Sequence, residues 1–372
     1  MIRIAIESRG AVLAALTLLA LLLASCAQMP DRDARQKDAK PLLYPAPPDE
    51  PRFIYERTIY GSADIVPEES DSALKRMLTG ETRRSEPLSK PYAVAVHRGR
   101  IFVSDSAERF VKVYDIPEGK AFKIGDDDNG RLAKPLGLDT DAQGNVYVAD
   151  ATAKAILVYD RDGRFLRKLA GPSHFDRLSS VTVDRKGERV YVVDIGGVSS
   201  EQHRVRVFDA QSGKHLFDFG KRGKGPGEFN LPRDVAIGKD GYLYVVDGGN
   251  FRVQVFDPDG KYLQTFGSIG KQLGNFARPK EIATDAGGNV YVIDAAFGNF
   301  QIFSPDGDLL MFIGDRSEQD GPARYMLPSG ITVDEDGRVY AVDQWFRKID
   351  VFRPYVMKSS DGWLGKRPVA KK

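Results

Sequence analysis

Cysteine is almost absent from this chain of 372 residues, because its one thiol is that of Cys26. A single cysteine excludes intrachain disulfides and multi-thiolate metal sites, so a folded domain must be stabilised by its core alone. An excess of one charge is also lacking, since 54 Lys and Arg residues balance 52 Asp and Glu residues to a formal net charge of +2. This balance gives no support for a nucleic-acid partner.

Long apolar runs are missing except near the N-terminus, where residues 11–24 read AVLAALTLLALLLA after the basic residues Arg3 and Arg9. A run of 14 residues has the length of the apolar region of a secretory signal peptide and is too short for a comfortable membrane span. The run ends in LASC, which resembles the lipobox of bacterial lipoproteins. The resemblance implies a signal peptide over residues 1–25 and a lipidated Cys26 at the mature N-terminus. The alternative is an ordinary signal peptide with an incidental cysteine.

The residues that follow predict a tether and a location. Residues 26–50 are polar and then Pro-rich, and they predict a disordered segment with a reach of roughly 25–30 Å. Ala27 rather than Asp follows the cysteine, which resembles the sorting pattern of outer-membrane lipoproteins. We therefore expect the protein in the cell envelope, anchored by lipid on the periplasmic side of the outer membrane. Its contact with the membrane is expected through the lipid anchor only.

The remainder of the chain is repetitive. The motif apolar-Tyr/Phe-Val/Ala-x-Asp occurs six times, as IFVSD, VYVAD, VYVVD, LYVVD, VYVID and VYAVD. The spacings between successive aspartates are 45, 44, 53, 47 and 49 residues, and the aspartates are Asp105, Asp150, Asp194, Asp247, Asp294 and Asp343. The third repeat is longer because it has a five-residue insertion over residues 198–202. A period near 47 residues indicates a repeat architecture rather than two unrelated domains.

Each repeat contains four short β-type runs separated by turns such as KDG and PDG, whose glycines favour antiparallel hairpins. Four-stranded antiparallel units with buried inner strands describe the blades of a propeller. The segments LPRDVAIGKDGYLYVVDGGNFRVQVFDPDGKYLQTFG and LPSGITVDEDGRVYAVDQWFRKIDVF resemble NHL repeats, and the resemblance covers roughly residues 91–352. It implies an all-β fold, a six-bladed β-propeller of the NHL type.

The sixth repeat ends before its fourth strand, and an isolated stretch near the N-terminus has the missing form. RFIYERTIYG alternates apolar and polar residues and ends in glycine, so residues 52–60 are predicted as the outer strand of blade six. The competing source of that strand is the tail segment VMKSSDGWLG. We thus expect the propeller over residues 51–356, with a C-terminal tail over 357–372. A short helix is predicted over residues 70–80, before blade one.

Candidate chemistry begins with the aspartates that end the second strands. Because an aspartate at a strand end accepts N–H bonds from its own loop, we interpret the six as structural rather than as a ring of catalytic carboxylates. The second residue after the Pro-like position that precedes each first strand is predicted near the central channel. Four of these six are small, whereas blades four and five have Asp234 and Glu281, each preceded by a base, Arg233 and Lys280.

These four charges are expected close together at the channel mouth. There the carboxylate pair could bind a cation such as Ca²⁺, hold a polar ligand or transfer protons. The alternative is an ion-pair cluster of little energetic value. Asp234 and Glu281 are thus weak candidates for a metal site, and no other cofactor is predicted.

The resemblance also implies an enzymatic alternative, because six-bladed propellers include metal-dependent lactonases and the amidating lyase. The lyase needs a histidine cluster. Here His97 and His215 are predicted on one face and His174 and His203 on the other, so the four cannot converge on a zinc ion. The lactonases have an early Glu-Gly-Pro, which does not occur in this chain.

Loop residues on the same face as the channel mouth are further candidates for binding. Arg109, Arg252, Trp345 and Arg347 lie in or just after the loops between second and third strands, and Trp and Arg dominate binding hot spots. The alternative is that the arginines hydrogen-bond between blades.

The sequence therefore predicts a binding or scaffold module, which presents its loop-rich face to a protein, peptide or glycan of the cell envelope. A hydrolase or lyase with a metal or carboxylate site at the channel mouth, similar to the lactonases, is the alternative. The candidate binding residues are Arg233, Asp234, Lys280, Glu281, Arg109, Arg252, Trp345 and Arg347.

Overall fold

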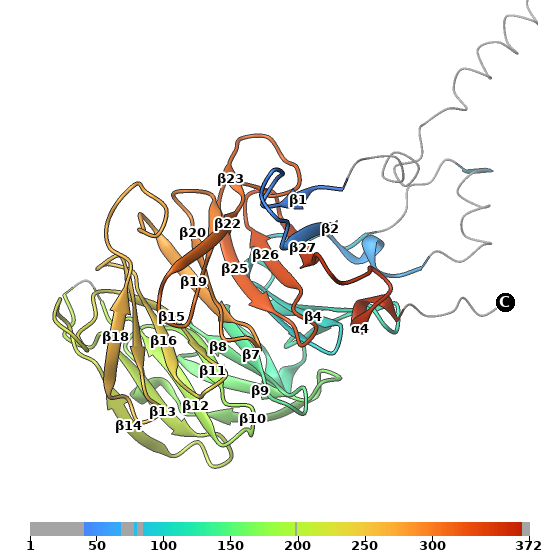
Figure 1. The fold of residues 1–372 in the computed structure, drawn as a ribbon. Coiled ribbons are helices and arrows are strands. Elements are labelled where there is room, and N and C mark those ends of the chain that lie inside the picture. Colours follow the sequence, from blue (N-terminus) through green and yellow to red (C-terminus); the bar gives the residue numbers. More distant parts are fainter. Residues whose placement is uncertain (1–40, 68–77, 80–84, 198, 367–372) are drawn as a thin grey trace, which may run out of the picture. The chain divides into compact units, whose positions relative to one another are not determined.

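The computed structural model describes residues 41–67, 78–79, 85–197 and 199–366. The chain divides into two units, Met1–Leu42 and Leu43–Lys372, and the second unit contains the fold (Figure 1). The predicted signal peptide and Cys26 lie outside the described residues, as does most of the helix predicted over 70–80. No helix in the described part of the chain is long and apolar enough to span a membrane.

The second unit is an all-β propeller of six antiparallel sheets, which confirms the predicted fold class. Blades one to three each have four strands in sequence order, with the first strand innermost. Their strands are β3 (Pro91–His97), β4 (Arg100–Asp105), β5 (Phe110–Asp115) and β6 (Lys120–Ile124); β7 (Pro135–Thr140), β8 (Val146–Asp150), β9 (Ala155–Tyr159) and β10 (Phe165–Leu169); and β11 (Leu178–Val183), β12 (Arg189–Asp194), β13 (Arg204–Asp209) and β14 (His215–Phe219).

Blades four and five repeat this pattern, and blade six ends the chain with three strands of its own. The strands are β15 (Pro232–Ile237), β16 (Leu243–Asp247), β17 (Arg252–Phe256) and β18 (Tyr262–Phe266); β19 (Pro279–Thr284), β20 (Val290–Asp294), β21 (Asn299–Phe303) and β22 (Leu309–Ile313); and β25 (Pro328–Val333), β26 (Val339–Asp343) and β27 (Lys348–Pro354). The short strands β23 (Asp315–Arg316) and β24 (Arg324–Tyr325) pair in the loop before blade six. The six innermost strands contact one another in the order β3, β7, β11, β15, β19, β25 and again β3, which closes a ring.

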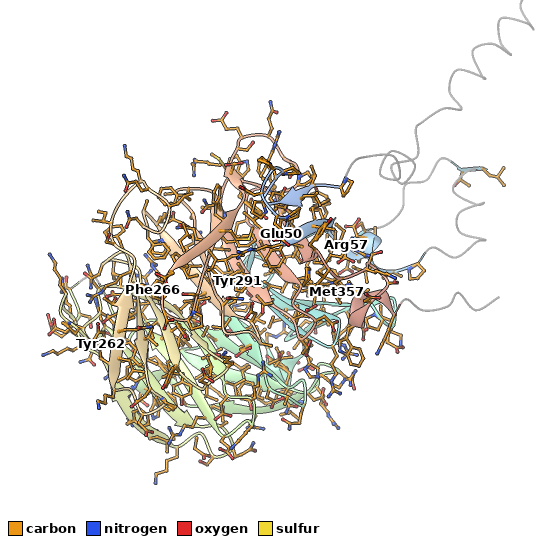
Figure 2. All side chains as sticks on the ribbon, in the orientation of Figure 1. Glu50, Arg57, Tyr262, Phe266, Tyr291 and Met357 are labelled. Atoms are coloured by element: carbon orange, nitrogen blue, oxygen red, sulfur yellow. The ribbon has the colours of Figure 1, made fainter. Side chains whose placement is uncertain are left out.

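The hydrophobic core lies between the blades. The second strands are buried along their whole length, except for Arg189 at the start of β12, because both faces of each inner strand meet a neighbouring sheet. Each cluster of buried apolar side chains joins two neighbouring blades. Tyr291 of blade five, labelled in Figure 2, belongs to one cluster with Ile331 of blade six and Phe53 near the N-terminus. Tight turns connect the strands, and Gly144 and Gly241 supply the positive φ that these turns require (83° and 82°).

Blade six is closed by the N-terminal segment, as the sequence predicts. Strand β2 (Phe53–Ile59) pairs antiparallel with β27, in a register that places Ile59 opposite Ile349. A buried ion pair supports the junction, in which Arg338 Nε donates to Glu56 Oε2 at 2.8 Å. Thr58 Oγ1 also donates to Asp350 Oδ1 at 2.5 Å.

Two predicted boundaries are wrong. The predicted tether extends to residue 50, but β1 (Leu43–Tyr44) pairs with β2 as a fifth strand of blade six, because the Tyr44 ring packs edge-on against Phe352 at 5.6 Å. The segment after residue 357 is likewise not only a tail. It includes α4 (Gly362–Gly365), whose Leu364 is buried in the cluster between blades six and one.

Candidate functional site

The ring has two different faces. Antiparallel pairing places the start of each first strand beside the end of the second strand, as for Pro91 opposite Asp105. We call this side the loop face; it comprises the second-to-third-strand loops and the segments that enter each first strand. The opposite side, the turn face, comprises the turns between first and second strands and between third and fourth strands.

The six aspartates that end the second strands are structural, as their position predicts. Asp294 accepts hydrogen bonds from four backbone N–H groups, those of Ala277 (2.7 Å), Arg278 (2.9 Å), Ala296 (2.9 Å) and Phe297 (3.2 Å). It thereby joins the segment entering its blade to its own loop. The same position in the other blades is equally buried and bonded to N–H groups, at Asp105, Asp150, Asp194, Asp247 and Asp343.

The centre of the ring contains a cavity of about 820 Å³, lined by the first strands and by the turn face. Its inner lining includes the small residues Ala93, Gly137 and Ser180 together with Asp234 and Glu281. The sequence position thus correctly places these residues at the channel. Their cavity, however, is lined by turn-face residues rather than by the binding candidates in the loops, so the predicted set of eight residues does not form a single site.

Asp234 and Glu281 join neighbouring blades. Asp234 accepts a hydrogen bond from Ser180 Oγ of blade three and another from the Ile282 N–H of blade five, the latter at 2.9 Å. Burial raises the pKa of Asp234 to about 6. Burial also raises the pKa of Glu281 well above its usual range, and the charge of Asp234 raises it further, whereas a backbone bond from Ile331 in blade six lowers it.

The bases beside these carboxylates are not bonded to them. In the described part of the chain, Arg233 and Lys280 have no ion pair, and neither lines the central cavity. Burial lowers the pKa of Lys280 to about 8, and the nearby charge of Arg278 lowers it further. The four charges are therefore near one another without forming the ion-pair cluster expected as the alternative.

Two of the loop candidates form a second pocket. Trp345, whose side chain is 61% exposed, and Arg347 line an open pocket of about 440 Å³ on the loop face, together with Lys90 and Gln344. Arg109 is exposed in the equivalent loop of blade one.

Arg252 has a different role. It donates to Asp247 at 2.9 Å and to the carbonyls of Gly225 (2.8 Å) and Glu228 (3.0 Å), so it anchors the loop that enters its own blade. Arg252 is therefore bonded structurally, but within its own blade and not between blades as the alternative expected. The sequence could not show this, because the carbonyl partners are 24 and 27 residues away.

The histidines do not converge. Among the described residues, no group of three or more His, Cys, Asp or Glu side chains is arranged to hold a metal ion. His97 lies on the turn face near Glu335, and His203 is buried on the loop face, where its ring accepts the Leu231 N–H at 3.1 Å. His215 lies at the start of β14, and His174 ends the short helix η3 (Pro172–His174).

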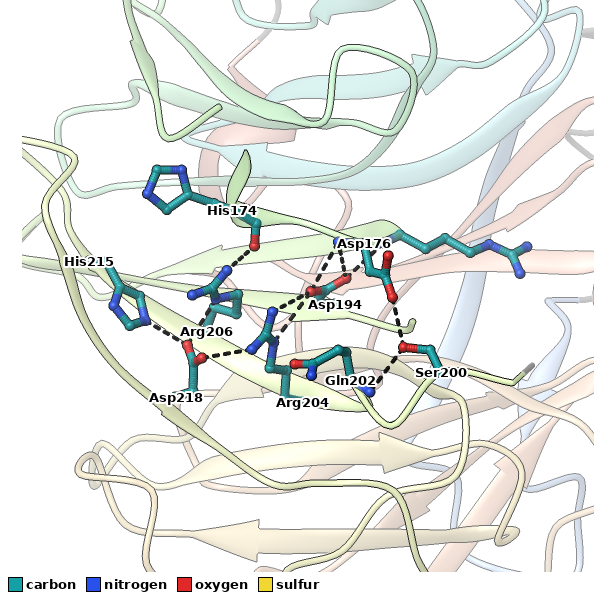
Figure 3. A network of polar contacts seen from close by, with 10 residues as sticks. His174, Asp176, Asp194, Ser200, Gln202, Arg204, Arg206, His215 and Asp218 are labelled. Carbon is teal, nitrogen blue, oxygen red and sulfur yellow. Dashed lines mark hydrogen bonds and ion pairs between the residues drawn. The ribbon is translucent and has the colours of Figure 1, made fainter. Parts of the chain in front are cut away.

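Blade three has a polar network that fixes its longer loop (Figure 3). Asp218 on β14 accepts from Arg206 Nε at 2.9 Å and lies 2.6 Å from His215 Nε2. Ser200, in the insertion, donates to Asp176 Oδ2 at 2.7 Å (Figure 3). The insertion is thus bonded to the segment that enters its own blade.

A feature missed from the sequence is a set of bases just before the first strands. Arg177 and Arg278 precede β11 and β19, and Lys90 and Lys134 take the same position before β3 and β7. The sequence pattern that could have revealed this set is a Lys or Arg directly before the first residue of four of the six first strands. It reads KP before β3 and β7, RL before β11 and RP before β19. These side chains lie on the loop face, at the end of the channel where Arg233 and Lys280 also lie.

Comparisons with known proteins agree with this fold. A family model described as a 6-bladed beta-propeller matches residues 198–268. NHL repeat-containing protein 3 of Homo sapiens is 35% identical over 89 residues, which are 24% of this chain and 24% of that protein. The probable peptidyl-alpha-hydroxyglycine alpha-amidating lyase pgal-1 of Caenorhabditis elegans is 30% identical over 108 residues, or 28% of this chain and 29% of the relative. The matches span only about a quarter of the length of these curated relatives.

Solved structures are similar across most of the ring. A streptogramin B lyase aligns with a TM-score of 0.54 at 13% identity, over 73% of this chain and 96% of that chain. A gluconolactonase from Xanthomonas campestris aligns with a TM-score of 0.53 at 16% identity, over 72% and 86%. Identities this low show the fold alone. Together, the repeats, the family model and the structure show that this chain forms a six-bladed β-propeller built from NHL-like repeats.

Proposed function

We propose that the protein is a lipid-anchored binding module of the cell envelope, which presents its loop face to a protein, peptide or glycan partner. The observation that carries the proposal is Trp345, which is 61% exposed beside an open pocket that it shares with Arg347 and Lys90. Trp and Arg are the residue types that dominate binding hot spots. A concave site that combines them with a lysine suits a partner with apolar and polar or anionic groups.

The Trp345 loop is held in place before any partner binds. Asp343 accepts the Phe346 N–H at 2.8 Å, and the Phe346 ring lies 5.6 Å from the buried ammonium of Lys348. Arg347 has a φ of 56°, in the left-handed region, so the turn has a defined shape. An anchored loop loses less conformational entropy when its side chains are buried by a partner, which favours affinity.

The central cavity is the alternative site, for a hydrolase or lyase. Its volume suits a small substrate, and the Caenorhabditis elegans relative is named as a lyase. However, Asp234 and Glu281, two of its carboxyl groups whose pKa values are raised by burial, both accept backbone bonds from the next blade. Because their oxygens already hold the ring together, we favour binding at the loop face.

Trp345→Ala is expected to lower partner recovery at least about tenfold, because removing a hot-spot side chain costs about 2 kcal/mol or more. The measurement is affinity capture from solubilised cell envelopes with the full-length chain as bait, quantified against the parent. Tyr242→Ala is the matched control, since Tyr242 is a partly exposed aromatic residue (42%) on the turn face. A Trp345→Ala chain that captures the same partner as well as the parent does would contradict the proposal.

The lipid anchor has its own test. Cys26→Ser is expected to move the protein from the membrane fraction to the soluble fraction, because a lipoprotein signal without its cysteine offers no acceptor for the lipid. Fractionation followed by detection of the propeller measures this. Unchanged membrane association of the Cys26→Ser chain would refute the anchor and leave the binding proposal intact.

A further inference from the structure

Four basic side chains surround the channel on the loop face: Arg177 of blade three, Arg233 of blade four, and Arg278 and Lys280 of blade five. They lie at or just before the starts of the innermost strands β11, β15 and β19, which contact one another in that order, so their charges are near each other. In agreement, Arg177 and Arg278 both lower the pKa of Arg233, after burial, and Arg278 and Arg233 both lower that of Lys280. We call these four residues the basic mouth. Lys90 and Lys134 continue the arc into blades one and two.

The basic mouth has no partners of its own. In the described part of the chain, none of its four side chains forms an ion pair or a hydrogen bond. By contrast, Arg204 and Arg252 on the same face are bonded to carboxylates. Four adjacent unpaired cations raise the energy of the empty protein, and a bound anion would lower it.

The nearby acids offset these cations only in part. Burial raises the pKa of Glu281 well above its usual range and that of Asp234 to about 6, so both carry less negative charge near neutral pH than exposed carboxyl groups do. Asp294 and Asp343 lie at the same face, but their oxygens are bonded to backbone N–H groups. Asp176 is bonded to Ser200.

The neighbouring groups also suit an anion. The Tyr92 side chain lies among these charges, where burial raises its pKa, so its phenol stays protonated and can donate a hydrogen bond. No described residue bonds to that hydroxyl. Gly248 leaves space for the stem of Arg233, because a Cβ at residue 248 would lie 2.7 Å from Arg233 Cγ. The base of the Arg233 side chain is therefore packed against residue 248, although the residue as a whole is exposed.

We propose that the basic mouth binds a small multivalent anion, or a partner's group, that carries two or more phosphate or carboxylate groups. Guanidinium groups bind both kinds of oxyanion through paired N–H donors, and a lysine adds a compact point charge. Cations contributed by three successive blades favour a ligand with several anionic groups over a single one. This inference names the ligand chemistry of the loop face, so it rests on the proposed binding function.

The test is calorimetric titration of the full-length chain in nonionic detergent with pyrophosphate and, separately, with citrate, at constant ionic strength. We expect saturable binding of at least one probe and a loss of at least tenfold in affinity for the double variant Arg233→Gln/Lys280→Gln. The matched control is Arg185→Gln/Lys186→Gln, which removes the same charge from exposed turn-face residues at the other end of the channel. This control is expected to bind like the parent. The preferred probe distinguishes phosphate from carboxylate ligands.

Thermal melting separates a binding role from a structural one. The Arg233→Gln/Lys280→Gln chain should melt no lower than the parent, because the substitutions relieve repulsion and remove no bond. If this chain fails to fold, Arg177→Gln, at an exposed position, takes its place with the same expected loss. Binding of neither probe, or equal affinity in the parent, mouth and control chains, would overturn the inference. Partner capture that still depends on Trp345 would then show that the proposed function stands without it.

Discussion

Deletion of residues 52–60 is expected to unfold the whole propeller rather than only loosen its N-terminus. Strand β2 is the fourth strand of blade six, so its loss exposes the edge of β27 and opens the contact between the first and last blades. The deletion also removes Glu56 and leaves Arg338, whose side chain is fully buried, with only the longer contact to Asp336 at 3.6 Å among its carboxylate pairs in the described residues. Breaking such a pair alone costs about 3–5 kcal/mol, which is comparable with the entire stability of many domains, about 5–15 kcal/mol. Circular dichroism and thermal denaturation measure the effect.

Point substitutions isolate the ion pair from the strand. Glu56→Ala should lower the free energy of unfolding by about 3–5 kcal/mol, and adding Arg338→Met should restore most of that loss because the buried guanidinium is removed as well. Glu335→Ala is the surface control, since its carboxylate is 41% exposed beside His97, and it should change stability by about 1 kcal/mol or less. A deletion chain that melts like the parent would show that the ring is closed elsewhere.

The closure of the ring could be predicted because one strand of a regular repeat lies at the other end of the chain from the rest of that repeat. Five repeats end in a fourth strand and the sixth does not, so residues 52–60 had a definite position to fill. Strand β1 could not be predicted in the same way. Its two residues lie in PLLYP, too short for any period, and their pairing depends on the Tyr44 contact with Phe352. The α4 helix is also short, with four residues, and Leu364 is buried only because two blades meet there.

The candidate site was only partly predictable. The repeat shows where a residue lies along its strand, but it does not show which side chains of other blades surround that residue. The repeat correctly placed Asp234 and Glu281 at the channel. It did not reveal that Ser180 and Ile282, in adjacent blades, bond to Asp234. Those contacts span 54 and 48 residues, and no local pattern encodes them. Arg177 could not be singled out from the sequence, because a single basic residue before a strand is common. Its significance depends on the basic residues of neighbouring blades that lie near it in the folded ring.

Asp294→Ala is expected to be among the most destabilising single substitutions in the ring. Four backbone N–H groups would lose their acceptor at once, in a position whose side chain is fully buried. A buried donor left unsatisfied costs about 1–3 kcal/mol, so the total loss should reach about 4 kcal/mol or more. Asp294→Asn keeps one acceptor oxygen and should lose about half as much. Urea denaturation of the three chains measures the difference.

The same substitution decides whether the six aspartates have a structural or a chemical role. If they are structural, Asp294→Ala lowers stability directly. It then weakens anion binding only indirectly, because Asp294 accepts the Arg278 N–H and its loss would displace Arg278. Arg278→Gln is the control that removes the charge and leaves the N–H bond. A chain with Asp294→Ala that melts like the parent but no longer binds its ligand would make the aspartate part of the site. We expect the loss of stability to be the primary effect and the loss of binding to follow from the displacement of Arg278. This is because the Asp294 carboxylate bonds both to its own loop and to the segment that enters the first strand.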